Sequence, residues 1–158
     1  MNNQWRRLNG EPISDIISET ETIILRELAE GNRIKICIGT DSQWHAALVE
    51  FATAIVFLRE KRGGFLLVRK EVLSYKGGLK QRMLDEVSRS IEIAYQLCPM
   101  LERYDIPMEV HADINQDPHF MSNVALKEAM GYILGMGFQF KAKPDAFASS
   151  SCANKVVQ

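Results

Sequence analysis

Acidic residues follow three apolar runs of this sequence. The stretch 34–43 reads IKICIGTDSQ, in which alternating isoleucines lead directly into Asp41. Asp113 lies near the end of a second run, EVHADIN, and Asp145 follows a third, FQFKAKP. A carboxylate at the edge of a core is costly unless a cation or hydrogen-bond donors neutralise it. Read singly, each acid also fits a turn or a helix cap, so only their combination favours a shared site.

Grouped carboxylates are typical ligands of hard divalent cations. Mg²⁺ or Mn²⁺ takes oxygen ligands and is commonly held by one or two carboxylates together with substrate phosphate. Two such ions about 4 Å apart can activate an attacking water and stabilise the leaving oxygen of a phosphodiester. A long predicted helix adds a fourth acid, Glu86, beside its apolar stripe, with Asp85 and Glu92 as alternatives. These acids predict metal-dependent cleavage of a nucleic-acid backbone.

Polar side chains beside the acids could support them or contact substrate. Those that follow the first strand also fit a polar turn, and a histidine within a strand is more often packed than reactive. An asparagine at a strand end is usually a turn residue, and a solvated lysine is the ordinary alternative to a phosphate contact. The candidates are Thr40, Ser42, Gln43, His111, Asn115 and Lys143.

The apolar pattern predicts the elements that position these residues. Three closely spaced strands predict an antiparallel meander, and two later strands, each preceded by a helix, predict parallel pairing through right-handed crossovers. Functional groups gather at the carboxyl ends of parallel strands, so Asp41 and Asp113 are expected to meet. A last short helix is expected after Asp145. The predicted helices cover 13–30, 79–101 and 122–137, and the predicted strands cover 34–41, 51–60, 65–74, 107–115 and 138–143.

Composition and charge set the class of protein. With 158 residues, 46% apolar and 25% charged, the chain suits one compact globular domain. Its net charge of −1 excludes an overall basic surface, although local patches act independently of the total. Lys76, Lys80 and Arg82 flank the start of the Glu86 helix and could meet phosphates, with ordinary solvated cations as the alternative.

Cysteine usage and hydropathy bear on localisation. Cys37, Cys98 and Cys152 are odd in number and far apart, which argues against a disulfide framework or a zinc knuckle. Reduced thiols are typical of the cytoplasm, where we expect this protein. The sequence begins without the apolar segment of a signal peptide, and no apolar run approaches the roughly 20 residues of a membrane span.

Four segments, IGTDSQ, HADIN, NVALKEAMGYILGMGF and KAKPDAFASSSCANKVVQ, resemble the YkuK-type ribonuclease H-like family, a bacterial branch of the ribonuclease H-like fold. The resemblance covers about residues 34–158. It implies an α/β fold with a mixed five-stranded sheet, three antiparallel strands followed by two parallel ones, flanked by helices. Residues 1–158 would form a single domain, with an N-terminal helical extension over 1–33 and the core over 34–158.

The resemblance also implies a mechanism and a site. Asp41 would bridge two Mg²⁺ or Mn²⁺ ions, Asp113 and Glu86 would complete the shell of one, and Asp145 would serve the other. The implied activity is hydrolysis of RNA, an RNA–DNA hybrid or structured DNA. The alternative is a non-catalytic module on the same fold that binds nucleic acid or protein. A different phosphoryl- or nucleotide-processing enzyme ranks last, because no glycine-rich phosphate loop supports it.

Overall fold

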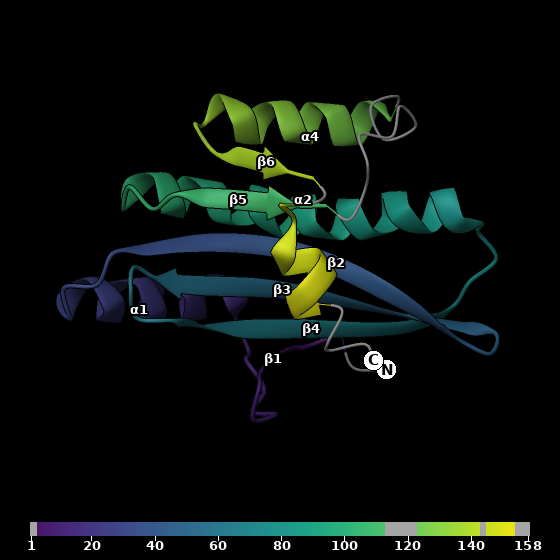
Figure 1. Ribbon diagram of the computed structural model, residues 1–158, viewed down its shortest axis with the longest axis horizontal. Helices are drawn as coiled ribbons and strands as arrows, with labels where there is room; N and C mark the ends of the chain where they lie inside the picture. Colours follow the sequence, from purple (N-terminus) through teal and green to yellow (C-terminus); the bar gives the residue numbers. More distant parts are fainter. Residues whose placement is uncertain (1–2, 113–122, 143–144, 154–158) are drawn as a thin grey trace.

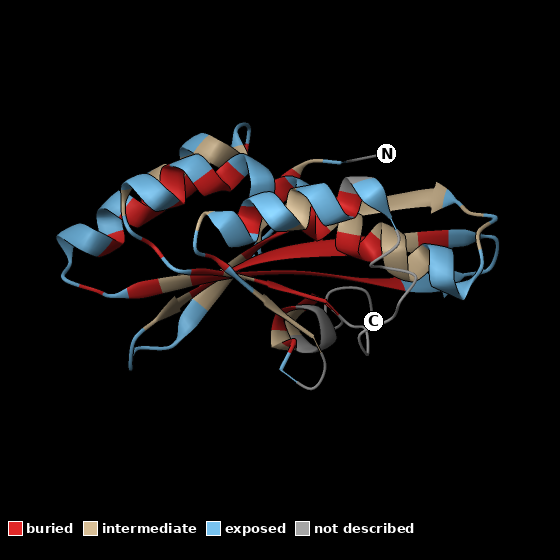
Figure 2. Cartoon of the chain, turned by 90° about the horizontal axis from the view of Figure 1, so that it is seen from above, coloured by how far each residue is buried: buried red, intermediate tan, exposed pale blue. Residues whose placement is uncertain are grey.

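A six-stranded mixed sheet is the centre of the protein, with three helices on one face and a short π-helix on the other (Figures 1 and 2). The computed structural model describes residues 3–112, 123–142 and 145–153. The strand order is β1-β4-β3-β2-β5-β6. The elements are β1 (Trp5–Arg7), α1 (Ile16–Ala29), β2 (Ile34–His45), β3 (Leu48–Arg59), β4 (Gly64–Ser74), α2 (Leu79–Arg103), β5 (Met108–His111), α4 (Val124–Gly135), β6 (Gln139–Lys141) and η1 (Ala148–Ala153).

The predicted topology is confirmed, with one strand added. Strands β2, β3 and β4 pair antiparallel, whereas β2–β5 and β5–β6 pair parallel. The prediction of five strands is wrong, because β1 pairs antiparallel with β4 through Trp5 and Arg69. A three-residue strand, WRR, is too short to show an alternating pattern. It is held by the buried Trp5 ring, over which the Arg69 guanidinium lies at 5.1 Å.

Strand β2 is longer than predicted. Asp41 does not end it, because β2 continues to His45 and Asp41 pairs with Ala52 of β3. A turn at Ala46, whose φ of 57° is left-handed, then reverses the chain. Parallel pairing with β5 stops earlier, at Gly39 opposite His111, and the hairpin extends past the end of β5 (Figure 1). Asp41 therefore lies inside a strand, yet just beyond its parallel part.

The helices begin and end near their predicted limits. Asp15 caps α1 by accepting hydrogen bonds from the backbone N–H groups of Ile17 and Ser18, so α1 starts three residues later than predicted. Helix α2 runs on through Pro99 to Arg103, so the proline does not end it. The last predicted helix is the π-helix η1. Among the described helices, none is long and apolar enough to cross a membrane.

Strand β2 carries a different core on each face. Ile34, Ile36 and Ile38 point into the main core beneath the helices, where each fully buried side chain contributes about 1.5–3 kcal/mol. Cys37 points the other way and packs with Ala148 of η1 in a smaller cluster. Figure 2 shows the central strands buried between these two layers. The sheet therefore holds its polar residues on rigid backbone with little freedom to move.

Candidate metal site and nucleic-acid interface

Strand β2 and helix α2 touch through a regular series of polar contacts. The hydroxyl oxygens of Thr40 and Ser90 lie 2.7 Å apart, and the Ser42 hydroxyl donates to Glu86 Oε2 at 3.0 Å. Two residues along a strand advance about 6.6 Å, and four along a helix advance about 6 Å. The matching advance lets the contacts repeat, and it turns the Glu86 carboxylate toward β2.

Asp41 and Glu86 form a buried carboxyl pair. Each residue is 7% exposed. Burial, followed by the nearby charge of Asp41 and a hydrogen bond shared with it, raises the pKa of Glu86 to about 8, against weaker lowering by Ser42 and Arg82. Within the described residues Glu86 makes no ion pair with a lysine, arginine or histidine. The pair is an acidic site that a divalent cation would stabilise.

The structure separates Glu86 from the two alternative helix acids. Asp85 accepts hydrogen bonds from the Tyr75 hydroxyl and from Gln81 Nε2, so its carboxylate faces the end of β4. Glu92 is exposed. Of the acids considered on α2, Glu86 is therefore the one that meets Asp41.

The other candidate acids and polar residues are exposed or lie outside the described residues. Asp145 is exposed three residues before η1, and its backbone N–H donates to the carbonyl of Ala142 at 2.9 Å. Gln43 is exposed opposite Glu50 in the hairpin. Asp113, Asn115 and Lys143 are outside the described residues. The structure thus brings together two of the four predicted acids and places a third at the surface.

His111 belongs to a second polar cluster, on the η1 face. The Glu109 carboxylate contacts Lys35 Nζ at 3.0 Å, His111 Nε2 at 2.8 Å and Cys37 Sγ at 3.9 Å. The backbone N–H of Ala148 donates to His111 Nδ1 at 3.0 Å. Because Nδ1 is an acceptor, the ring proton sits on Nε2 and is donated to Glu109. The histidine thereby ties β5 to the first residue of η1.

The polar groups of this cluster are paired with one another in the metal-free protein. The ligand atoms of Cys37, Glu109 and His111 lie within 4.8 Å of one another, which no other trio of such residues in the described ranges does. Burial, followed by the Glu109 charge, raises the pKa of Cys37 to about 12, so without a metal ion the thiol keeps its proton. Burial also lowers the pKa of His111, although Glu109 opposes this, and its Nε2 is already protonated. The cluster is a closed hydrogen-bond network, neutralised by Lys35.

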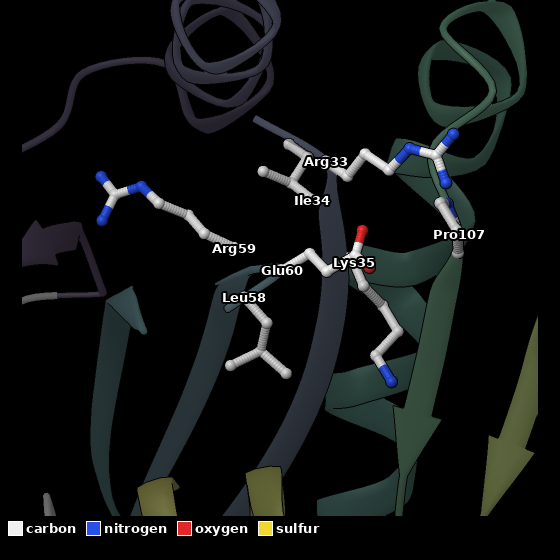
Figure 3. A pocket seen from close by; sticks show the side chains of 7 residues that line it. All are labelled: Arg33, Ile34, Lys35, Leu58, Arg59, Glu60 and Pro107. Atoms are coloured by element: carbon white, nitrogen blue, oxygen red, sulfur yellow. The ribbon is translucent and has the colours of Figure 1, made fainter. Parts of the chain in front are cut away.

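A pocket of about 410 Å³ opens at the other end of β2 (Figure 3). Its cations include Arg33, Lys35 and Arg59, and its apolar lining residues are Ile34, Leu58 and Pro107. Arg59 Nε pairs with the buried Glu27 at 2.6 Å, and Lys35 pairs with Glu109. Asp41 lies six residues further along β2 than Lys35, or about 20 Å. The pocket is therefore separate from the carboxyl pair.

The sequence reading missed an aromatic group beside the carboxyl pair. Trp44 follows Ser42 on the same face of β2 and is 43% exposed. Its ring contacts Tyr75 edge-on at 5.7 Å, and the Arg82 guanidinium lies 5.5 Å from its centroid. Two signals could have found the group: a tryptophan within the polar stretch SQWH, and Arg82 placed one helical turn before Glu86.

The mixed sheet and its helices agree with a ribonuclease H-like fold. The model of the family Ribonuclease H-like matches residues 16–158, so the chain belongs to that family, as its motifs predicted. Among solved structures, the chain is similar to an RNase H1 from the halophilic archaeon Halobacterium salinarum NRC-1, with 12% identity and a TM-score of 0.36, over 72% of this chain and 89% of that one. A likeness of this size carries no information on activity. The comparison with curated proteins found no match.

Proposed function

We propose that this protein is a divalent-metal-dependent nuclease of the ribonuclease H-like class, which hydrolyses phosphodiester bonds in RNA, an RNA–DNA hybrid or structured DNA. The observation that carries the proposal is the buried contact between Asp41 and Glu86 at the end of the parallel pairing. Membership of the family supports it.

The donor set of the carboxyl pair fits Mg²⁺ or Mn²⁺, which prefer hard oxygen ligands. A Glu86 pKa of about 8 means that a proton occupies, at neutral pH, the place that a cation would take. Two ions held there would supply water activation and stabilisation of the leaving oxygen. We assign Asp113 and Asp145 as the remaining ligands. Asp113 follows His111 by two residues, just as Asp41 follows Gly39, the β2 partner of His111.

The neighbouring residues of the chain prepare this site. The Ser42 hydroxyl donates to Glu86 Oε2, and Glu86 also shares a hydrogen bond with Asp41. The contact between Thr40 and Ser90 holds α2 against β2 two residues before Ser42 along the strand. We assign Gln43, Asn115 and Lys143 to contacts with the substrate backbone, and His111 to holding η1 in place. In this arrangement positioning is done by rigid elements rather than by loops.

Hydrolysis of labelled RNA, hybrid and DNA with Mn²⁺ or Mg²⁺ tests the proposal. Removing a ligand should cost more than the roughly 100-fold that loss of an outer-sphere partner can cost, so Asp41→Asn and Asp113→Asn should each abolish turnover. Glu92→Gln, which changes an exposed acid on the same helix, is the matched control and should retain activity. Activity that survives both aspartate substitutions would contradict the assigned site.

The alternative is a module that binds nucleic acid or protein without turnover. The net charge of −1 favours it slightly, because strong nucleic-acid binders are commonly basic. Calorimetry with Mn²⁺ separates the two functions. Absence of binding, or binding unchanged by Asp41→Asn, would favour the module. In either case we propose a single domain over 1–158 and a cytoplasmic location, which three free cysteines support.

A further inference from the structure

We propose that a nucleic-acid strand binds at an aromatic platform formed by Trp44, Tyr75 and Arg82, where an unpaired base stacks on Trp44 and a phosphate pairs with Arg82. The inference rests on the proposed function, because it names the substrate surface beside the carboxyl pair. It also defines the class of substrate: a strand that is single-stranded next to the bond that is cut.

The platform is the outermost step of the contact series between β2 and α2. Thr40 meets Ser90, Ser42 meets Glu86, and Trp44 meets Arg82. Four residues, or about 6 Å, separate Arg82 from Glu86 along α2. A phosphate held by Arg82 would therefore lie within one or two nucleotides of the carboxyl pair.

Arg82 has hydrogen-bond donors that the described residues do not use. Nε and Nη1 of Arg82 are two of the four buried side-chain nitrogen or oxygen atoms in the described ranges that have no hydrogen-bond partner. By contrast, Arg59 pairs with Glu27 and Arg89 pairs with Glu71. A buried donor without an acceptor is costly, and the forked guanidinium is suited to two oxygens of one phosphate. Arg82 is therefore suited to an anion that the described residues do not supply.

Trp44 presents an exposed ring in a fixed orientation. The Tyr75 ring contacts it in a T-shaped arrangement, and the Tyr75 hydroxyl donates a hydrogen bond to Asp85. A large aromatic ring that is 43% exposed yet braced on two sides is a stacking surface that needs little ordering on binding. Stacking on such a ring is tolerant of sequence, because every base has a π-face, but the base must be unpaired.

Local charge favours the same partner. Lys76 and Lys80 are exposed at the start of α2, next to Arg82 in the chain. They add positive charge on the side of the molecule where the phosphates would lie, despite the net charge of −1. A strand tracking over Arg82 toward the carboxyl pair would pass this group, so its binding should weaken as salt is added.

Tryptophan fluorescence gives a direct test. The chain has two tryptophans, and Trp5 is buried, so a Trp5→Phe protein reports on Trp44 alone. We expect a single-stranded 12-mer, titrated with EDTA present, to quench this emission. A blunt duplex of the same sequence should bind more weakly and leave the emission unchanged. Heparin, a polyanion without bases, should compete for binding without quenching.

Substitutions then separate the two contacts. Arg82→Met, which keeps the apolar stem, should weaken binding about tenfold and reduce the salt slope by about one. Trp44→Leu should also weaken binding of a labelled strand about tenfold. The matched control is Arg103→Met, at the other end of α2, which should bind as the parent protein does. If Trp44→Leu does not fold, quenching in the Trp5→Phe protein still decides the question.

The outcomes distinguish this inference from the nuclease proposal. Binding with quenching and an Arg82 effect, but no hydrolysis when metal is added, would support the platform and contradict the nuclease. Hydrolysis together with unchanged binding by Arg82→Met, or equal quenching by the blunt duplex, would overturn the platform alone. Quenching by heparin would also overturn it, because stacking requires a base.

Discussion

Glu86 and Glu109 are glutamates that approach β2 from opposite faces of the sheet, and their surroundings move their pKa values in opposite directions. Burial and the charge of Asp41 raise the pKa of Glu86 to about 8. Burial also acts on Glu109, whose side chain is 12% exposed, but hydrogen bonds from His111 and Lys35 and the charge of Lys35 outweigh it and lower the pKa.

The difference shows which carboxylate is neutralised by the residues that the structure describes. Glu109 has a cation and two further donors within its own fold, so its charge is neutralised and it acts structurally. Among the described residues, Glu86 has a second carboxyl group and one serine beside it, and a weaker cationic contribution comes from Arg82. Such an excess of acid among neighbouring groups is stabilised by bound protons or by divalent cations.

The largest expected effect is a loss of hydrolysis without a loss of stability when an acid of the carboxyl pair is replaced. Asp41→Asn should reduce hydrolysis more than 100-fold, yet leave the free energy of unfolding unchanged or raised, because it removes one of two acids in contact. Urea denaturation beside the nuclease assay measures both. A loss of stability above about 1 kcal/mol would show that Asp41 is structural, like Glu109.

The opposite result is expected at the closed network. Glu109→Ala should lower the free energy of unfolding by about 2 kcal/mol, because it leaves the His111 N–H without its acceptor and Lys35 without its partner. Glu60→Ala, which removes an exposed acid from the pocket at the same end of β2, is the control. Equal urea midpoints for the two variants would refute a structural role for Glu109.

The raised pKa of Glu86 should make the stability of the folded protein depend on pH. The pKa of Glu86 is raised from 4.5 to about 8, so the folded state holds an extra proton between these values. In the metal-free protein, the stability that this proton gives is complete below pH 4.5 and is lost as pH rises to about 8, by at least about 1 kcal/mol. Glu86→Gln should flatten this fall. Thermal unfolding in EDTA from pH 5 to 9 measures it, and an unchanged slope would contradict the buried pair.

The smallest expected effect concerns the link from His111 to η1. An asparagine at position 111 keeps an acceptor near the place of Nδ1, whereas a leucine does not. His111→Asn should therefore be about 1 kcal/mol more stable than His111→Leu, and should retain slow exchange of the Ala148 amide hydrogen. Amide exchange followed by NMR measures the contact directly. Equal exchange rates in both variants would show that the hydrogen bond does not hold η1.

The sequence predicted the pairing of five of the six strands, because that pairing depends on patterns within short stretches of the chain. Helix-period patterns placed α1, α2 and α4, and the short strand connections predicted the meander. It was insufficient where few residues carry an element, as in β1, and where turn-forming types continue a strand, as Gly39 and Asp41 do in β2. Those residues form β2 because β3 pairs with them along its length.

The candidate site, too, could be predicted only in part from the sequence. Acids at chain positions typical of the fold were visible, but the choice of Glu86 over Asp85 depends on which side of α2 faces Ser42. The network of Lys35 and Glu109 was invisible, because these residues are 74 positions apart and meet only through the β2–β5 register. Arg82 was seen as a cation, but its unused donors exist only in the packed structure.

The contact series between β2 and α2 also limits how the length of this protein can vary. Deleting one residue between Arg82 and Ser90 would turn one part of the helix by about 100° relative to the other and shift it by about 1.5 Å. The contacts on one side of the deletion would then be lost even if those on the other side were kept. Removing a whole helical turn would break the series too, because the residues of β2 that face α2 would keep their spacing of two and one of them would lose its partner on the helix. We therefore expect relatives that share this site to keep the nine residues from 82 to 90 free of insertions and deletions, and to accumulate length differences beyond Arg103 or in the connections between strands.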